Sequence, residues 1–254
     1  MSAATRLMFA MAAVLLMAAC VHSNPARPIK KENAAQYNMQ LGIAYLHQGN
    51  LPLAKEKLDR AMSEGPREPA VHSAMALLYD RLDKPREADE EFRTALRLGP
   101  EDPDILNNYA IYLCRVGRTD EGVKNFLEAA HNGLYRTPET AYTNAGVCLR
   151  AGNKLDLAAR QFENALAVRP NYGEAAYQLV DLEYTQHDLA AARQQLDKYL
   201  GAFDATPDLL LIGVRVTRAQ GDRLAAERLA RKLRLDFSST DQARALAELD
   251  RNAG

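Results

Sequence analysis

Tryptophan is absent from this sequence of 254 residues, cysteine occurs only three times, and neither charge predominates. The formal net charge of −1 gives no electrostatic signature of nucleic-acid binding. The apolar stretch at the N-terminus, Leu7 to Met17, has eleven residues, whereas a bilayer-spanning helix needs about 20. What remains is a chain that is 47% hydrophobic and 26% charged, as expected for packed helices.

Motifs of common catalytic sites are also missing. The five histidines are scattered and form no His-Glu-x-x-His motif, and no Gly-x-Ser-x-Gly motif occurs. Segment 117–124 superficially resembles a phosphate-binding loop, but it lacks the Gly-Lys-Ser/Thr ending. We therefore predict that the chain is not an enzyme and needs no metal ion or other cofactor.

A period of 34 residues is the most informative feature that is present. In rows of 34 that start at Ala35, small, aromatic and proline residues recur at matching positions. The first row contains Leu41, Gly42, Tyr45, Gly49, Ala54, Leu58, Ala61 and Pro66, and the second contains Met75, Ala76, Tyr79, Ala88, Phe92, Ala95 and Pro100. This register resembles the tetratricopeptide-repeat signature, in which each row folds as one helix–turn–helix unit.

We therefore predict an all-α fold, a tetratricopeptide-repeat superhelix (α-solenoid). Each helical pair buries its apolar face only by stacking on a neighbour, so one continuous core grows with the number of repeats. The inner wall of such a curved stack is a surface that binds other chains. The predicted units are six repeats (35–68, 69–102, 103–138, 139–172, 173–206 and 207–239) and a capping helix with a tail at 240–254.

Alanine recurs at one position of the second helix of the repeats, as Ala54, Ala88, Ala158 and Ala192. A small residue that returns with the repeat indicates a point where two helices cross closely. A larger side chain there would overpack the crossing.

The N-terminus reads as a lipoprotein signal. Arg6 supplies a basic start, Leu7 to Met17 is apolar, and Leu-Met-Ala-Ala precedes Cys20, which resembles a lipobox. We predict a signal peptide at 1–19, an acylated Cys20 and a flexible tether at 20–34. Ordinary secretion with cleavage after Ala18 or Ala19 is the alternative. In similar bacterial lipoproteins, a residue such as Val21 after the cysteine favours the outer membrane.

Cys114 and Cys148 both fall on the first helix of a repeat, in the third and fourth repeats. These helices lie side by side in a solenoid, and an exported protein meets an oxidising compartment. We expect a disulfide between them. Two buried free thiols are the alternative.

The first helices of the repeats form the concave wall. It carries an apolar strip in the first repeat and a row of carboxamides that recurs from repeat to repeat. Carboxamides both donate and accept hydrogen bonds, so a row of them suits an extended peptide. The alternatives are that the apolar strip is core facing the next repeat and that the amides bond within their own helices. The predicted partner-binding groove comprises Gln36, Met39, Gln40, Ile43, Leu46, Asn107, Asn108 and Asn144.

A basic run near the C-terminus comprises Arg223, Arg228, Arg231, Lys232 and Arg234. We interpret it as a solvated helix face, because acidic residues lie nearby in the sequence. Contact with acidic headgroups or with a partner is the alternative.

Three segments resemble one particular family. They are 106–114 (LNNYAIYLC), 134–139 (LYRTPE) and 144–148 (NAGVC), and they are similar to the type IV pilus biogenesis lipoproteins, the secretin pilotins (PilF/PilW). The resemblance implies a lipid-anchored protein on the periplasmic face of the outer membrane of a Gram-negative bacterium. It also implies binding to the pilus secretin subunit, whose localisation and multimerisation the protein promotes, and hence pilus biogenesis and twitching motility.

Two other functions stay open at this point. One is a lipid-anchored adaptor that recruits a cell-wall hydrolase or protease, whose deletion would weaken the envelope. The other is a component of an outer-membrane β-barrel assembly complex, whose deletion would deplete barrel proteins generally. None of these readings involves a nucleic acid or a small-molecule substrate.

The lipobox generates the first prediction. Cys20→Ser removes the thiol that accepts the lipid, so the protein should leave the membrane fraction for the soluble periplasmic fraction. Fractionation of cells that express either form measures this. Continued outer-membrane fractionation of the variant would contradict lipid anchoring.

Overall fold

The computed structural model describes residues 31–252, with the side chains of residues 34–251. The predicted signal peptide, Cys20 and residues 20–30 of the predicted tether lie outside this range. The described part is a stack of helices without strands. Its elements are α2 (Lys31–His47), α3 (Leu51–Glu64), α4 (Pro69–Arg81), α5 (Pro85–Leu98), α6 (Pro103–Arg115), α7 (Thr119–His131), α8 (Pro138–Ala151), α9 (Leu155–Val168), α10 (Gly173–Thr185), α11 (Leu189–Leu200), α12 (Pro207–Ala219), α13 (Arg223–Asp236) and α14 (Asp241–Asn252).

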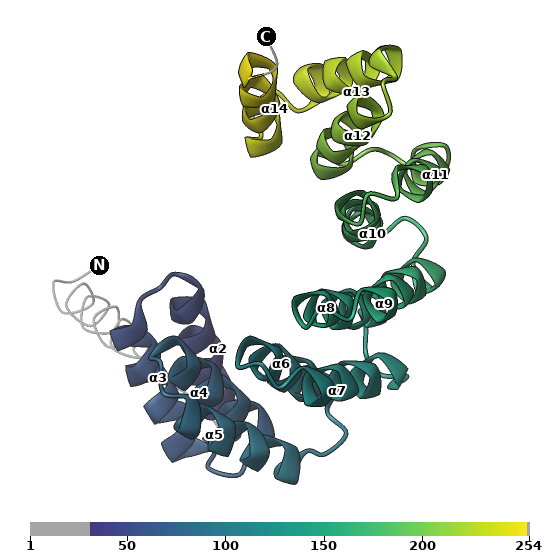
Figure 1. The fold of residues 1–254 in the computed structure, drawn as a ribbon. Helices are drawn as coiled ribbons and strands as arrows, with labels where there is room; N and C mark the ends of the chain where they lie inside the picture. The colour runs from purple at the N-terminus through teal and green to yellow at the C-terminus, as the bar shows by residue number, and fades with distance from the viewer. Residues whose placement is uncertain (1–30, 253–254) are drawn as a thin grey trace, which may run out of the picture.

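Consecutive helices from α2 to α13 form six antiparallel pairs, and the pairs stack into an arc (Figure 1). The even-numbered helices lie on the inner side of the arc and the odd-numbered ones on the outer side. The predicted all-α solenoid is confirmed. One boundary differs: α2 begins at Lys31, so the last four residues of the predicted tether are helical.

The turn inside every pair contains one residue in the left-handed conformation. In three pairs this residue is glycine, the residue that adopts positive φ without steric cost. In every pair the backbone N–H of the residue after the left-handed one donates to the carbonyl oxygen five residues before it, as in the bond from Asn50 N to Tyr45 O (2.9 Å), and this bond closes the end of the first helix. The left-handed residues are Gly49, Asp83, Gly117, Asn153, His187 and Gly221.

The repeats are held together by a large side chain on each second helix that reaches the next pair. Phe92 of α5 is fully buried and packs on Tyr109 and Tyr112 of α6, with ring centroids 5.2 and 5.4 Å apart. Phe126 of α7 packs in the same way against alanines of α8. Because each pair supplies part of its neighbour's core, the core runs through the whole stack.

The predicted capping helix is α14. Leu246 and Ala243 are buried against α12 and α13, where they contact Leu210 and Leu233. Asp250 accepts hydrogen bonds from arginines on both of these helices. Residues 31–252 therefore contain a stack in which every helix packs on another and whose C-terminal end is covered, and we expect this segment to fold without the residues before it.

No helix within residues 31–252 is both long enough and apolar enough to span a membrane.

A buried carboxylate in α10 sets a pH dependence. The Oε2 atom of Glu183 is buried and has no hydrogen-bond partner among the described residues. Burial raises the pKa of Glu183 to about 7, and the negative charges of Asp188 and Glu163 add to the shift. The folded state therefore binds a proton that the unfolded state has lost between about pH 4.5 and pH 7, and stability falls as the pH rises through this window.

Glu183→Gln should remove this effect. At pH 8 we expect the free energy of unfolding to rise by about 1 kcal/mol, which allows for partial solvent screening, and the melting temperature to rise by about 2–4 °C. At pH 4, where Glu183 is mostly protonated in both the folded and the unfolded state, the variant should match the wild type. Thermal melts at both pH values measure this, with the exposed Glu128→Gln as control. An equal shift at both pH values would contradict the titration.

Candidate protein-binding site

The inner wall of the arc is hollowed between α6 and α8, the first helices of the third and fourth repeats. The hollow encloses about 270 Å³ and is lined mainly by apolar atoms. A concave apolar surface with a few polar groups is the usual form of a site that binds a side chain of another molecule. The lining residues are Ile111, Cys114, Arg115, Phe126, Asn144, Val147, Cys148 and Ala151.

Two aliphatic side chains stand exposed beside this hollow. Ile111 is 46% exposed and Val147 is 42% exposed, although both are β-branched hydrophobic residues on well-packed helices. Both occupy the ninth position of their repeat, which faces out of the stack toward the inside of the arc. Exposed apolar residues gathered at a concave place indicate an interface.

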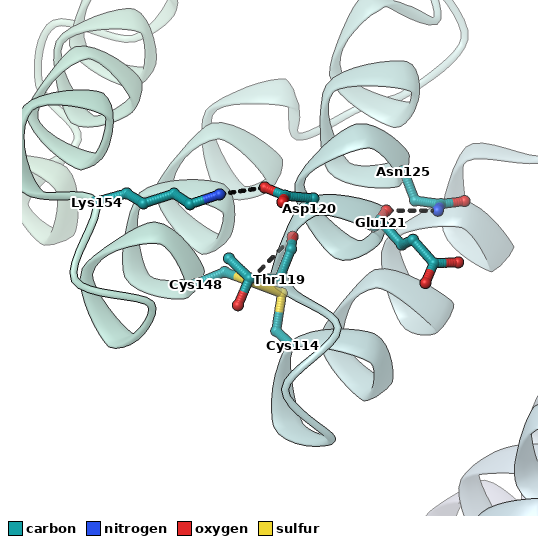
Figure 2. Close-up of a disulfide and its surroundings, with 7 residues drawn as sticks. All are labelled: Cys114, Thr119, Asp120, Glu121, Asn125, Cys148 and Lys154. Atoms are coloured by element: carbon teal, nitrogen blue, oxygen red, sulfur yellow. Dashed lines mark hydrogen bonds and ion pairs between the residues drawn. A yellow bond between two sulfur atoms is a disulfide. The ribbon is translucent and has the colours of Figure 1, made fainter.

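A disulfide forms the floor of the hollow. Cys114 of α6 is bonded to Cys148 of α8, with Cα atoms 5.6 Å apart (Figure 2). This Cα separation is within the usual range of disulfides. The bond joins two helices that are neighbours in space and separated by 34 residues in the chain, so it fixes the spacing of the two walls.

Gly122 shows how the fold accommodates this bond. The second helix of the third repeat has glycine where the other five repeats have the alanine of the close crossing. A Cβ atom at Gly122 would overlap the sulfur of Cys114 and lie 3.0 Å from the carbonyl oxygen of Ala110. The disulfide sulfur thus occupies the space that a methyl group fills elsewhere.

Two further contacts join the same pair of repeats. Asp120, at the start of α7, forms an ion pair with Lys154, which precedes α9 (Figure 2). On the inner wall, Asn144 Nδ2 donates to Asn107 Oδ1 at 3.4 Å. The joint between the third and fourth repeats is therefore held at the floor, at the wall and at the outer surface.

The arginines next to the hollow are paired with acids of neighbouring repeats. Arg115 forms an ion pair with Asp80 of α4, and Arg150 forms one with Asp181 of α10 at 2.7 Å. Both carboxylates are largely buried, so the pairs link first helices across repeat boundaries. The hollow is therefore flanked by neutralised charges, which suits an apolar or neutral ligand better than an ionic one.

The structure separates the predicted groove residues into two groups. Gln36, Met39, Gln40, Ile43 and Leu46 are all on α2, whereas Asn107, Asn108 and Asn144 are on α6 and α8, with α4 between the two groups. Gln36 and Gln40 are exposed, and Met39 and Ile43 are half-buried.

Leu46 was expected to face the groove, and this prediction is wrong. The side chain is only 5% exposed and packs in a core cluster with Ala74 and Leu78 of α4. Met39 and Ile43 lean against the same cluster. The apolar strip of α2 is thus in large part the surface that the first repeat buries against the second.

Asn107 and Asn144 are hydrogen-bonded to each other, which uses one polar atom of each side chain. Asn108 is half-buried next to them on α6. The predicted groove did not include Ile111, Arg115, Val147 and Ala151. Ile43, which it did include, occupies the ninth position of its repeat, as Ile111 and Val147 do, so this repeat position was the available signal for both.

Within residues 31–252, no cluster of three or more histidine, cysteine, aspartate or glutamate side chains is arranged to hold a metal ion.

Comparison with known proteins agrees with this architecture. The tetratricopeptide-repeat family model matches residues 73–136 and 143–208. The type IV pilus assembly protein PilF of Pseudomonas aeruginosa is 30% identical over 208 residues, which cover 80% of this chain and 82% of that protein.

Solved structures show the same relationship. The structure of Pseudomonas aeruginosa PilF superposes with a TM-score of 0.65 at 28% identity and covers 86% of this chain and 98% of that one. The crystal structure of PilW, described as a widely conserved type IV pilus biogenesis factor, gives a TM-score of 0.65 at 25% identity over 84% of this chain and 98% of that one.

The fold and its apolar inner-wall hollow define a solenoid scaffold of the class that binds other proteins. The chain belongs to the tetratricopeptide-repeat family and, within it, to the group of PilF and PilW.

The disulfide generates a prediction. Peptide mapping without reductant should recover a linked Cys114–Cys148 peptide from protein exported to the periplasm. Gly122→Ala should lower the melting temperature, because overpacking against the sulfur costs about 1–3 kcal/mol. Gly133→Ala is the matched control, since a Cβ atom there meets nothing within 4 Å. Two free thiols in the denatured, unreduced protein would contradict the cross-link.

Proposed function

We propose that this protein is an outer-membrane lipoprotein that binds the type IV pilus secretin and promotes its localisation and multimerisation. The observation that carries the proposal is the apolar hollow of the inner wall, with Ile111 and Val147 exposed beside it. Its relatives support the pathway, since PilF is named as a type IV pilus assembly protein and PilW as a pilus biogenesis factor. The protein acts by binding and has no catalytic role of its own.

The chemistry of the hollow fits one segment of a secretin subunit. Such a subunit is rich in β-structure and exposes unpaired strand edges and apolar side chains until its ring closes. An apolar side chain of the subunit would enter the hollow, and Asn108, together with the amide atoms of Asn107 and Asn144 that their mutual hydrogen bond leaves over, would bond to its backbone. Covering this segment prevents incorrect association between subunits.

The lipid anchor at Cys20 would complete the function. A protein tethered to the membrane and a subunit bound to it share one surface, which raises their effective concentration. Multimerisation on the membrane then becomes faster than aggregation in solution.

Charges placed in the hollow should abolish the function. Ile111→Asp with Val147→Asp places two carboxylates where an apolar ligand must be desolvated, so binding of the secretin subunit should weaken by at least about thirtyfold, on the order of 2 kcal/mol. Because both positions are already exposed, the melting temperature should change little. Copurification of the secretin and heat-resistant secretin multimers in a complemented deletion strain measure the effect.

The matched control places the same charges elsewhere. Leu157→Asp with Val168→Asp changes two residues of α9 that are 43% and 50% exposed and lie outside the hollow, so secretin binding should be unchanged. Wild-type levels of multimers and twitching motility with the Ile111 and Val147 variant would contradict the site. Loss of unrelated barrel proteins in the deletion strain would instead favour a general assembly role.

A further inference from the structure

The second helix of the last repeat, α13, concentrates positive charge in a chain that is nearly neutral. Its fourteen residues include five basic and two acidic side chains. The chain as a whole has a formal net charge of −1. The positive charge of α13 is therefore a local feature. The arrangement of its side chains decides whether this helix face is only solvated or can bind a partner.

Four residues of α13 form a line along the helix, and we call them the α13 stripe: Leu224, Arg228, Arg231 and Leu235. Their spacings of four, three and four residues place them on one side of an α-helix. The buried residues of α13 are on the opposite side. Leu224 is 82% exposed and Leu235 is 73% exposed, so these leucines point away from the core and do not belong to its edge.

The arginines of the α13 stripe are also free of partners. Arg234 is paired with Glu227 and Asp250, and Lys232 is paired with Asp236. For Arg228 and Arg231, the described part of the chain offers no carboxylate within ion-pair distance. The acidic residues near α13 therefore pair with Lys232 and Arg234 but not with the two arginines of the α13 stripe.

A second hollow adjoins the α13 stripe. It encloses about 230 Å³ between α11 and α13, and its charged lining consists of Arg193, Arg228, Lys232 and Asp197. Asp197 is engaged by Arg193 at 2.7 Å, so the Arg228 side of the hollow presents positive charge. The rest of the lining is mainly apolar, and Arg193 and Lys232 are paired with acids, so Arg228 is the unpaired charge at the edge of an apolar hollow.

We propose that the α13 stripe is a docking surface for a bilayer that contains anionic phospholipids. Arginines attract anionic headgroups, and leucines on the same exposed line enter the boundary between headgroups and acyl chains. The two leucines are eleven residues apart, or about 16 Å along the helix, so both reach a flat surface together. An acidic protein segment would pair with the arginines but would leave the leucines in water, and the bilayer accounts for both.

This contact is independent of secretin binding and of the lipid at Cys20. It would hold the last repeat to a membrane, whereas the lipid would hold the first. Each arginine at an anionic surface contributes about fivefold to the partition coefficient, so two arginines and two leucines together give a measurable affinity without any acyl chain.

Vesicle cosedimentation of the unacylated chain 21–254, which keeps every described helix, tests the proposal. We expect binding to vesicles of phosphatidylcholine with about 30% phosphatidylglycerol, weak binding to phosphatidylcholine alone, and loss of binding at high salt. Leu224→Ser with Arg228→Gln should weaken binding to the anionic vesicles about tenfold, and Leu235→Ser with Arg231→Gln should have a similar effect.

Leu157→Ser with Arg160→Gln is the matched control, because it removes one exposed leucine and one exposed arginine from α9. It should bind as the wild type does, and circular dichroism should show that all variants are folded. Equal binding of wild type and stripe variants would overturn the proposal. So would a wild type that ignores anionic vesicles but binds octaglutamate, which would assign the stripe to an acidic protein segment.

Discussion

The packing of one helical pair against the next is the interaction on which everything else in this molecule depends. No pair can bury its own apolar face, and side chains such as Phe92 and Phe126 complete the core of the repeat that follows. The inner wall is a product of this stacking, since its helices are placed by the residues behind them. A site on the wall therefore lies at a joint between repeats, and its shape depends on how firmly that joint is held.

The joint between the third and fourth repeats is reinforced more than a repeat protein requires. The link before α8 makes the third repeat, 103–138, two residues longer than the period of 34. Its Tyr135 packs into the local core, and the side chain of Asn132 donates to the carbonyl oxygen of Glu101. The disulfide then fixes α6 to α8 directly. Loop-closure estimates give roughly 3–4 kcal/mol for a cross-link of this span. The place with the most irregular chain is thus also the place where the wall is most rigidly defined, and the hollow lies there.

The repeating features could be predicted from the sequence, whereas the rotation of individual helices could not. The period of 34 gave the number of pairs, and adjacency of the first helices predicted the partner of Cys114. Leu46 was misassigned because neighbouring positions on a helix differ by about 100° in direction, and only the angle between the first two repeats decides which of them is covered. Val147 was recoverable from the repeat position of Ile111. The start of α2 at Lys31 was not, because Lys31, Glu32 and Asn33 are polar and show no apolar helical period.

The cross-link also has a mechanical consequence. In the proposed function the protein would be fixed to a membrane at one end and attached to an assembling ring elsewhere, so it would be pulled along its length. A one-dimensional stack yields to such a pull by peeling away repeat after repeat. The bond between Cys114 and Cys148 removes the chain between them, residues 115–147, from the path of the force. About 120 Å of chain cannot be drawn out while the bond is intact. The middle of the arc would thus keep its shape under loads that straighten its ends.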